Sequence, residues 1–432
     1  MSILGAMYAA VSGLNANSNA LGIISDNIAN SNTIGYKDTT TDFSTLVTQS
    51  TASSYSPGGV TSKPLYNTAQ QGSIQSESSP TDLAISGGGF FVVNSNAAGV
   101  SGTGTTSFTR AGNFTVDANG DLVNAAGLYL QGQVLTPAQS AAIAAGAAPT
   151  LGGTTLAGLQ TINVNGIAET ATPTANVTLN ANLPANATSP ESMTVPVYDT
   201  EGIEHDLTVT FTPSGAANTW TVSAAFNNAG TSTATIAGGN DTVKFNSDGT
   251  LNAAGTTFNA ANALQIAWDP SASGGTSPQD VSFNLGADGT TSGLSQLGSA
   301  FTVSDISQDG VQFGSFSSVS IGANGLVSAN FSNGQTRAIA IVPIATFEDP
   351  DGLTPTSGNT YLESADSGLP LLEEAGTGAA GQIDPSSLEN STVDIAGEFS
   401  QLIITQNAYS ANSKVLTTAN QMTQALLSIQ VG

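Results

Sequence analysis

Residues 1–37 read MSILGAMYAAVSGLNANSNALGIISDNIANSNTIGYK, and the spacing of their apolar side chains decides the architecture at this end of the chain. Alternating gaps of three and four residues define one stripe, which holds Leu4, Met7, Val11, Leu14, Ser18, Leu21, Ser25 and Ile28. Such heptad spacing places a stripe on one side of an α-helix, where it is buried against a partner. The stretch from Asn30 to Gly35 is typical of a helix end. The sequence therefore predicts a helix over residues 1–30.

The other end of the chain repeats this pattern. Val415, Ala419, Met422, Leu426 and Ile429 keep the same rhythm, and an apolar face formed by Phe399, Leu402 and Ile403 precedes them. No proline follows Pro385, so a long helix within residues 386–432 is predicted. Two heptad helices at the two ends of a chain are expected to pack with each other or with neighbouring subunits.

The polar residues of these helices are mostly uncharged amides rather than the alternating Glu and Lys of a solvated coiled coil. Such a surface suits a helix that other protein covers, since an unpaired charge would be costly there. We therefore interpret both ends as a polymerisation core. Its predicted members are Leu4, Met7, Val11, Leu14, Leu21 and Ile28 in the first helix and Phe399, Leu402, Ile403, Tyr409, Val415, Ala419, Met422, Leu426 and Ile429 in the second.

The sequence between the helices has the pattern of β-structure. Short apolar runs such as Leu207–Phe211 and Ala338–Val342 alternate with Asn-Gly and Asp-Gly pairs, which favour tight hairpin turns. The expected fold is mainly β with long terminal helices that pair, and with discontinuous β-domains between them. The expected domains are a terminal helical domain (1–30 and 386–432), a connecting segment (31–71 and 354–385), an inner β-domain (72–135 and 306–353) and an outer, variable β-domain (136–305).

The charge composition excludes several classes of protein. The chain has 6 Lys and Arg against 31 Asp and Glu, a net charge of −25, although only 9% of its residues are charged. Six scattered cations are too few to neutralise a nucleic acid or to hold the chain on an anionic membrane. No apolar run reaches the roughly 20 residues of a membrane span. The first cation is Lys37, so the positive start of a secretory signal is missing and a dedicated export route is expected.

The sequence offers no catalytic constellation. Cysteine is absent, which removes thiolate chemistry and cysteine-based zinc sites, and His205 is the single histidine. His205 has acidic neighbours and could be a metal ligand, but we interpret it as a residue of a surface turn or strand. We expect no enzymatic activity, no cofactor, and no catalytic or metal site.

Several motifs resemble the bacterial flagellar rod and hook axial proteins. The N-terminal signature consists of Ser12, Gly13, Leu14, Asn27, Ile28, Ala29, Asn30, Asn32, Thr33, Gly35, Tyr36 and Lys37. The C-terminal helix matches at Glu398, Phe399, Gln406, Tyr409 and Lys414. Between them, Asp82–Ile85 and Thr109–Gly112 resemble the shared β-domain, and Val195–Gly202 resembles an outer-domain strand and turn of the hook members.

This resemblance implies a structural subunit of the flagellar hook. Such a subunit would assemble with copies of itself into a flexible tube that passes torque from rod to filament and encloses the export channel. The implied partners are further copies, rod proteins, hook-cap and hook–filament junction proteins, and the export machinery, at an extracellular location. A distal rod or junction component is the first alternative, and a surface-layer or adhesin-type protein is less favoured. An extracellular hydrolase has no catalytic pair to support it.

The net charge leads to a prediction about assembly. With −25 on every subunit, like-charge repulsion should oppose stacking, and salt should screen it. We expect the polymer yield to rise between low and moderate ionic strength, as measured by light scattering. A flat titration would contradict this.

Overall fold

The computed structural model describes residues 3–51, 54–97, 104–165, 167, 171–226, 233–236, 242–256, 263–269, 279–298 and 300–430. The chain folds into two compact units. Unit 1 comprises Met1–Gly166, Ser318–Ala329 and Thr336–Gly432, and unit 2 comprises Ile167–Ser317 and Asn330–Gln335. Residues 136–166, which the sequence analysis places in the outer β-domain, lie in unit 1.

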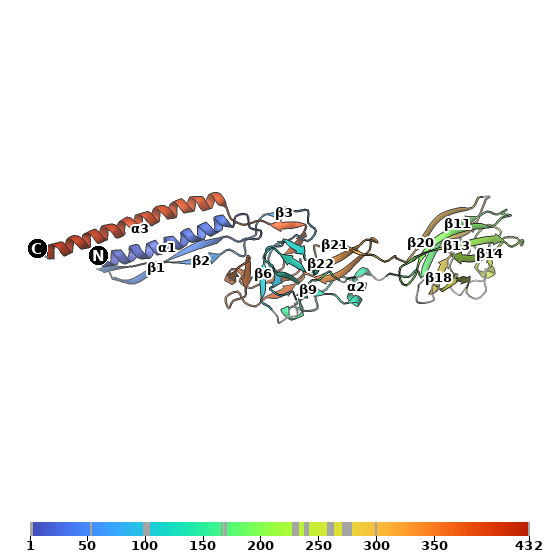
Figure 1. The fold of residues 1–432 in the computed structure, drawn as a ribbon, viewed down its shortest axis with the longest axis horizontal. Coiled ribbons are helices and arrows are strands. Elements are labelled where there is room, and N and C mark those ends of the chain that lie inside the picture. The colour runs from blue at the N-terminus through green and yellow to red at the C-terminus, as the bar shows by residue number, and fades with distance from the viewer. Residues whose placement is uncertain are drawn as a thin grey trace. The chain divides into compact units, whose positions relative to one another are not determined.

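Both predicted terminal helices are present in unit 1. Helix α1 (Ile3–Ala29) and helix α3 (Ile395–Gln430) lie side by side, and the antiparallel hairpin of β1 (Thr39–Thr51) and β2 (Ser54–Tyr66) runs along α1 (Figure 1). The hairpin falls in the stretch that the sequence suggested was a connecting segment. The fold class, mainly β with paired terminal helices, is confirmed.

A sheet of short strands forms the rest of unit 1. Its main path runs β21-β22-β23-β9-β5-β6-β26-β25. These strands are β21 (Phe316–Ile321), β22 (Leu326–Phe331), β23 (Thr336–Ile341), β9 (Tyr129–Val134), β5 (Phe90–Asn94), β6 (Thr106–Thr109), β26 (Thr360–Leu362) and β25 (Thr354–Thr356). Side branches add β7 (Phe114–Val116), β8 (Leu122–Asn124), β10 (Gln160–Thr161), β24 (Ile344–Thr346) and β27 (Leu371–Glu373). Helix α2 (Pro137–Ala144) begins at a Thr136 cap.

Two small strand pairs join distant parts of the sequence at the base of the helices. Strand β4 (Leu83–Ser86) pairs with β28 (Gln382–Pro385), and β3 (Ile74–Ser76) pairs with β29 (Ser387–Glu389). Both pairs therefore fix residues 382–389, which precede α3, against residues 74–86.

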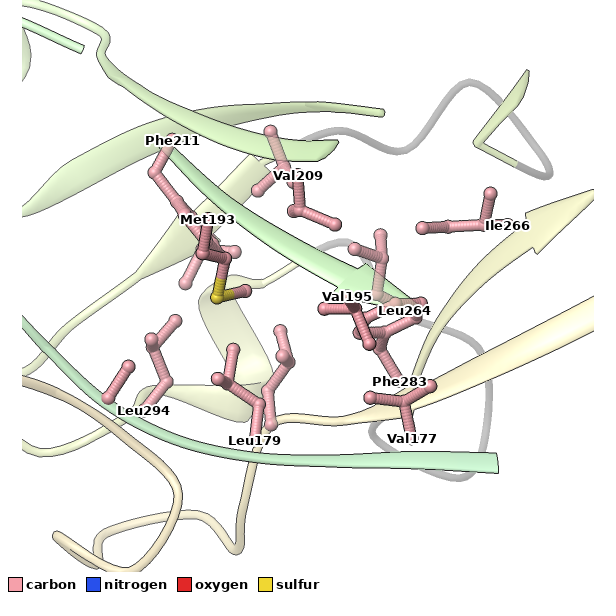
Figure 2. Close-up of a cluster of buried hydrophobic side chains, with 14 of the residues drawn as sticks. Val177, Leu179, Met193, Val195, Val209, Phe211, Leu264, Ile266, Phe283 and Leu294 are labelled. Atoms are coloured by element: carbon pink, nitrogen blue, oxygen red, sulfur yellow. The ribbon is translucent and has the colours of Figure 1, made fainter. Parts of the chain in front are cut away.

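Unit 2 is built from two sheets around one core. One sheet has the order β12-β13-β14-β16, and the other has β15-β17-β18-β11-β19 with β20 also paired to β11. Their bounds are β11 (Asn176–Leu183), β12 (Glu191–Tyr198), β13 (Glu204–Pro213), β14 (Thr219–Phe226), β15 (Thr233–Ile236), β16 (Thr242–Lys244), β17 (Ala263–Asp269), β18 (Gln279–Asn284), β19 (Leu294–Gln296) and β20 (Thr302–Gln308). Residues from both sheets, including Val195 and Phe283, meet in this core (Figure 2).

Alternation along the strands explains how this core forms. In β13, Leu207, Val209 and Phe211 are fully buried, whereas Thr208 and Thr210 between them are half-buried. Successive side chains of a strand point to opposite faces, so one face of β13 is apolar. No helix among the described residues is long and apolar enough to cross a membrane.

The buried face of β13 can be tested by truncating Phe211. We expect F211A to lower the free energy of unfolding of unit 2 by about 3–5 kcal/mol, because the lost contacts leave a cavity. Both tryptophans of the chain, Trp220 and Trp268, belong to unit 2, so their fluorescence in a denaturant titration reports this transition. T210A, on the other face, serves as the control and should cost less than about 1 kcal/mol. Equal effects of the two changes would argue against the described core.

Candidate functional site: the paired helices and their base

The contact between α1 and α3 uses small side chains. Helix α1 buries Ala10, Gly13, Ala16, Ala20 and Ile24, and a Cβ added to Gly13 would lie 2.8 Å from Nδ2 of Asn412 in α3. On α3, Thr405 and Ala419 are buried, and Leu402 and Asn412 are half-buried. Because Gly13 has no side chain, the two helices approach closely at this point. Gly13 of the signature is therefore explained by the approach of α3.

Ser12 fixes the hairpin to the other side of α1. Its hydroxyl donates to the carbonyl oxygen of Ala9 at 2.9 Å and accepts from the amide of Val60 in β2 at 3.2 Å. Gly59 has φ +94°, and a Cβ there would lie 2.3 Å from Oγ of Ser12. The Ser12–Gly13 pair thus seats α1 between β2 and α3.

Asn27, at the end of α1, holds three segments together. Its Nδ2 donates to the carbonyl oxygen of Thr39 and to Oε1 of Glu398, each at 2.8 Å. Its Oδ1 accepts from the amide of Thr39 at 3.0 Å and from the hydroxyl of Tyr36 at 3.2 Å. Two donors and two acceptor positions are the full capacity of an amide side chain, so Asn27 is satisfied although it is 1% exposed.

The environment of Asn27 shifts two neighbouring acids. Burial raises the pKa of the Glu398 carboxyl, and the hydrogen bond from Asn27 opposes that rise. Burial also raises the pKa of the Tyr36 hydroxyl, with the charges of Asp26 and Asp38 adding to the effect. Tyr36 therefore stays a neutral donor to Asn27.

Three buried charged side chains lie beside this network, and we call Lys37, Arg110 and Glu389 the helix-base cluster. Nζ of Lys37 lies 2.5 Å from Oε1 of Glu389, and Nη1 of Arg110 lies 3.2 Å from Oε2. All three residues are at most 3% exposed. Two of the six cations of the chain thus share one carboxylate in the interior.

Backbone groups add hydrogen bonds to the helix-base cluster, although Nε of Arg110 is buried without a hydrogen-bond partner among the described residues. Oε1 of Glu389 also accepts from the amide of Gly72 at 2.7 Å, and Nη2 of Arg110 donates to the carbonyl oxygen of Gly87 at 2.8 Å. Lys37 donates to the carbonyl oxygen of Gln70. The Arg110 guanidinium also lies 5.2 Å from the ring centre of Phe90.

Two opposing effects act on the pKa values of the two cations in the cluster. Burial lowers the pKa of the Lys37 ammonium and of the Arg110 guanidinium, and the charge of Glu389 opposes both shifts. Removing the carboxylate would leave two like charges in a poorly solvated site. Glu389 is therefore the residue on which the cluster depends.

The structure brings part of the N-terminal signature together at the helix base. Gly35 has φ +65° and packs against the backbone of Arg110, its amide donating to the carbonyl oxygen of Glu389 at 2.7 Å. Asn30 accepts from Thr33 at 3.1 Å in the turn after α1. Leu14 and Ile28 are half-buried, and Ala29 and Asn32 are exposed.

Glu389 escaped the sequence analysis. The available signal was a lone acid in the short stretch Ser387–Glu389, in a chain whose Lys37 and Arg110 both lie in motifs. Nothing local showed that these residues, 352 positions apart for Lys37 and Glu389, would meet.

The predicted polymerisation core lies mostly outside the contact between α1 and α3. Leu4, Val11, Phe399, Ile403, Tyr409, Val415, Met422 and Leu426 are exposed. Met7, Leu14, Leu21, Ile28 and Leu402 are half-buried, and Ala419 is buried. The side chain of Ile429 lies outside the described residues. The role of this core in polymerisation stays a prediction.

The interpretation of His205 as a surface residue is wrong. His205 lies in strand β13, as one of the two predicted settings, but it is 2% exposed. Its Nε2 lies 3.0 Å from Oδ2 of Asp199, whose Oδ1 accepts from the amide of Ile203 at 2.8 Å. A buried acid partner therefore accommodates the imidazole. Among the described residues, no group of three or more His, Cys, Asp or Glu side chains is placed to hold a metal ion.

Comparison with protein families places the chain in one class. Residues 7–37 match a flagella basal body rod protein family, and residues 84–151 match the D1 domain of the flagellar hook protein FlgE/F/G. Residues 163–311 match the D2 domain of the flagellar basal body protein FlaE, and residues 385–429 match the C-terminal part of the flagellar basal body rod FlgEFG proteins. The protein is thus of the flagellar rod and hook class.

Relatives over the full length identify the family within that class. The chain is 36% identical over 436 residues to the flagellar hook protein FlgE of Brucella abortus, with 100% of both chains covered. It is 30% identical over 433 residues to that of Escherichia coli, covering 98% of this chain and 99% of the other. The crystal structure of the Helicobacter pylori hook protein FlgE2 matches with a TM-score of 0.44 and 16% identity, covering 73% of this chain and 100% of that one. The chain belongs to the bacterial flagellar hook protein family, and it is a structural hook subunit.

The helix-base cluster can be tested by neutralising its carboxylate. We expect E389Q to destabilise unit 1 by about 3–5 kcal/mol, because Lys37 and Arg110 lose their buried counter-charge. The measurement is a denaturant titration followed by circular dichroism at 222 nm, where α1 and α3 dominate. E363Q, which removes one exposed carboxylate, should leave the transition within about 0.5 kcal/mol. Were both variants equally stable, the cluster would not support unit 1.

Proposed function

We propose that this structural hook subunit assembles with copies of itself into a flexible tube, which passes torque from the rod to the filament and encloses the export channel. The observation that carries the proposal is the set of large apolar side chains that stay exposed on the paired helices α1 and α3. The two helices meet where Gly13 lies against Asn412, and many large apolar side chains of both helices stay exposed, although Ile24 of α1 is buried.

The exposed apolar side chains lie in the first part of α1 and along most of the length of α3. Helix α1 exposes Leu4, Tyr8 and Val11 by 41–66%, and helix α3 exposes Ile395, Phe399, Ile403, Ile404, Tyr409, Val415, Met422, Leu426 and Leu427 by 40–61%. Large exposed apolar surfaces mark sites of association. We propose that copies of α1 and α3 from neighbouring subunits cover them, with residues 1–30 and 386–432 as the polymerisation domain.

The surface of unit 2 is consistent with a tube that bends. We propose that unit 2 forms the outer domain and that its contacts with neighbours are polar and weak, so that subunits slide while the helices stay packed. Strand β20 carries mostly exposed Ser, Thr and Asp side chains, which suits such contacts.

The other elements of the proposal follow from the family. We propose that rod, hook-cap and junction proteins and the export machinery are partners, that the chain is exported to an extracellular location, and that it has no enzymatic activity.

The role of the exposed α3 side chains can be tested at Ile403 and Ile404, which are 58% and 61% exposed. We expect the double variant I403N/I404N to reduce polymer mass at least tenfold in a sedimentation assay, because the helices lose apolar surface at the contact. The circular dichroism of the monomer should not change, since both side chains are more than half exposed. I403L/I404L is the matched control and should polymerise normally. Normal tubes from I403N/I404N in electron micrographs would contradict the proposed role of the exposed α3 side chains.

A further inference from the structure

The two helices run antiparallel in a register that two contacts define. Gly13 lies against Asn412, and Asn27 is hydrogen-bonded to Glu398. The residue numbers sum to 425 in both cases, 13 + 412 and 27 + 398. In this register the first residue of α1, Ile3, lies level with Met422, since 425 − 3 = 422.

Helix α3 therefore continues beyond the described part of α1. We call its last eight residues, Thr423–Gln430, the α3 overhang. At 1.5 Å per residue the overhang is about 12 Å long. Leu426 and Leu427 on it are 55% and 58% exposed. No charged residue follows Lys414.

A groove lies at the opposite end of the helix pair. This helix-base groove has a volume of about 1030 Å³. Its lining residues include Ser18, Gly22 and Asp26 of α1, Lys63 and Tyr66 of β2, and Ala126. A Cβ built on Gly22 would meet no atom within 4 Å, so the groove is open above the helix.

The groove has room for a second helix and carries an exposed cation, Lys63. Ser18 and Gly22 are one helical turn apart and leave room for a second helix to approach. Lys63 is exposed and, among the described residues, has no carboxylate within salt-bridge distance, although Asp42 lies opposite it in the hairpin and Asp26 also lines the groove. The carboxyl end of a helix carries a partial negative charge, and α3 has no basic side chain in its last turn. Lys63 can supply that missing positive charge.

We propose that the α3 overhang of one copy occupies the helix-base groove of the next copy. This inference rests on the proposed self-assembly and specifies its axial contact. In the antiparallel register, Leu426 lies level with a point on the extended axis of α1 that would be numbered −1, because 425 − 426 = −1. Gly22 and Leu426 are therefore 23 helical residues apart along this axis. They are therefore separated by about 35 Å along the helix pair of one chain. A contact between two different surfaces at opposite ends is heterologous, and it propagates into a filament instead of closing into a dimer.

The first experiment uses the absence of cysteine in the natural chain. The double variant G22C/L426C is polymerised under reducing conditions and then oxidised. We expect a ladder of disulfide-linked multimers on a denaturing gel. A bond within one chain is excluded, because a disulfide requires Cα atoms about 4.4–6.8 Å apart. The single variants G22C and L426C should give no ladder.

The second experiment fills the groove in the full chain. We expect G22F to lower polymer mass at least tenfold relative to G22A, with the circular dichroism of the monomer unchanged, because the added ring occupies the space of the overhang. Normal polymerisation of G22F, or unlinked tubes from oxidised G22C/L426C, would overturn the axial contact and leave the proposed function intact. If the unaltered chain forms no tubes in electron micrographs, the proposed function fails, and this contact fails with it.

Discussion

The carboxylate of Glu389 holds the helical end of the subunit to its inner β-structure. It is shared by Lys37, which follows α1, and by Arg110, which follows strand β6, so three distant segments meet at one buried acid. Two cations in the interior are costly unless they are paired and hydrogen-bonded. The cluster therefore forms only when all three segments are in place. The strand pair β3–β29 and the Asn27 network then fix the directions in which α1 and α3 leave the base.

The packing of α1 against α3 depends on a second constraint, which is the short distance between the two helices at Gly13. Gly13 allows α3 to approach α1, and many bulky apolar side chains of the two helices stay exposed. A pair joined by large residues would have used up its apolar surface within one molecule. Here each subunit keeps apolar surface for association. The scarcity of charged residues on these helices also favours burial of their surface by other protein, since burying an unpaired charge would cost free energy.

Local pattern predicted much of this architecture. The heptad spacing placed both terminal helices, the turn residues from Asn30 to Gly35 marked the end of α1, and the Asn-Gly and Asp-Gly pairs indicated β-structure between. The pattern did not show which stripe would face the partner helix, because leucine and valine appear better suited to burial than alanine and glycine when a helix is considered alone. His205 was misplaced for a similar reason. Its acidic neighbours indicated a surface residue, but Asp199, six positions earlier, lies across the turn and pairs with it in the interior.

The sequence by itself determined the class of fold, the two terminal helices and the membership in the axial protein family, since these follow from periodicities and motifs within short windows. The low fraction of charged residues and the net charge of −25 also needed no structure. Only the tertiary structure decided which residues of each helix touch, that Asn27 satisfies four groups at once, and that Glu389 pairs with Lys37 across 352 positions. Those outcomes depend on which segments the fold brings together, and no local spacing encodes the position of a partner hundreds of residues away.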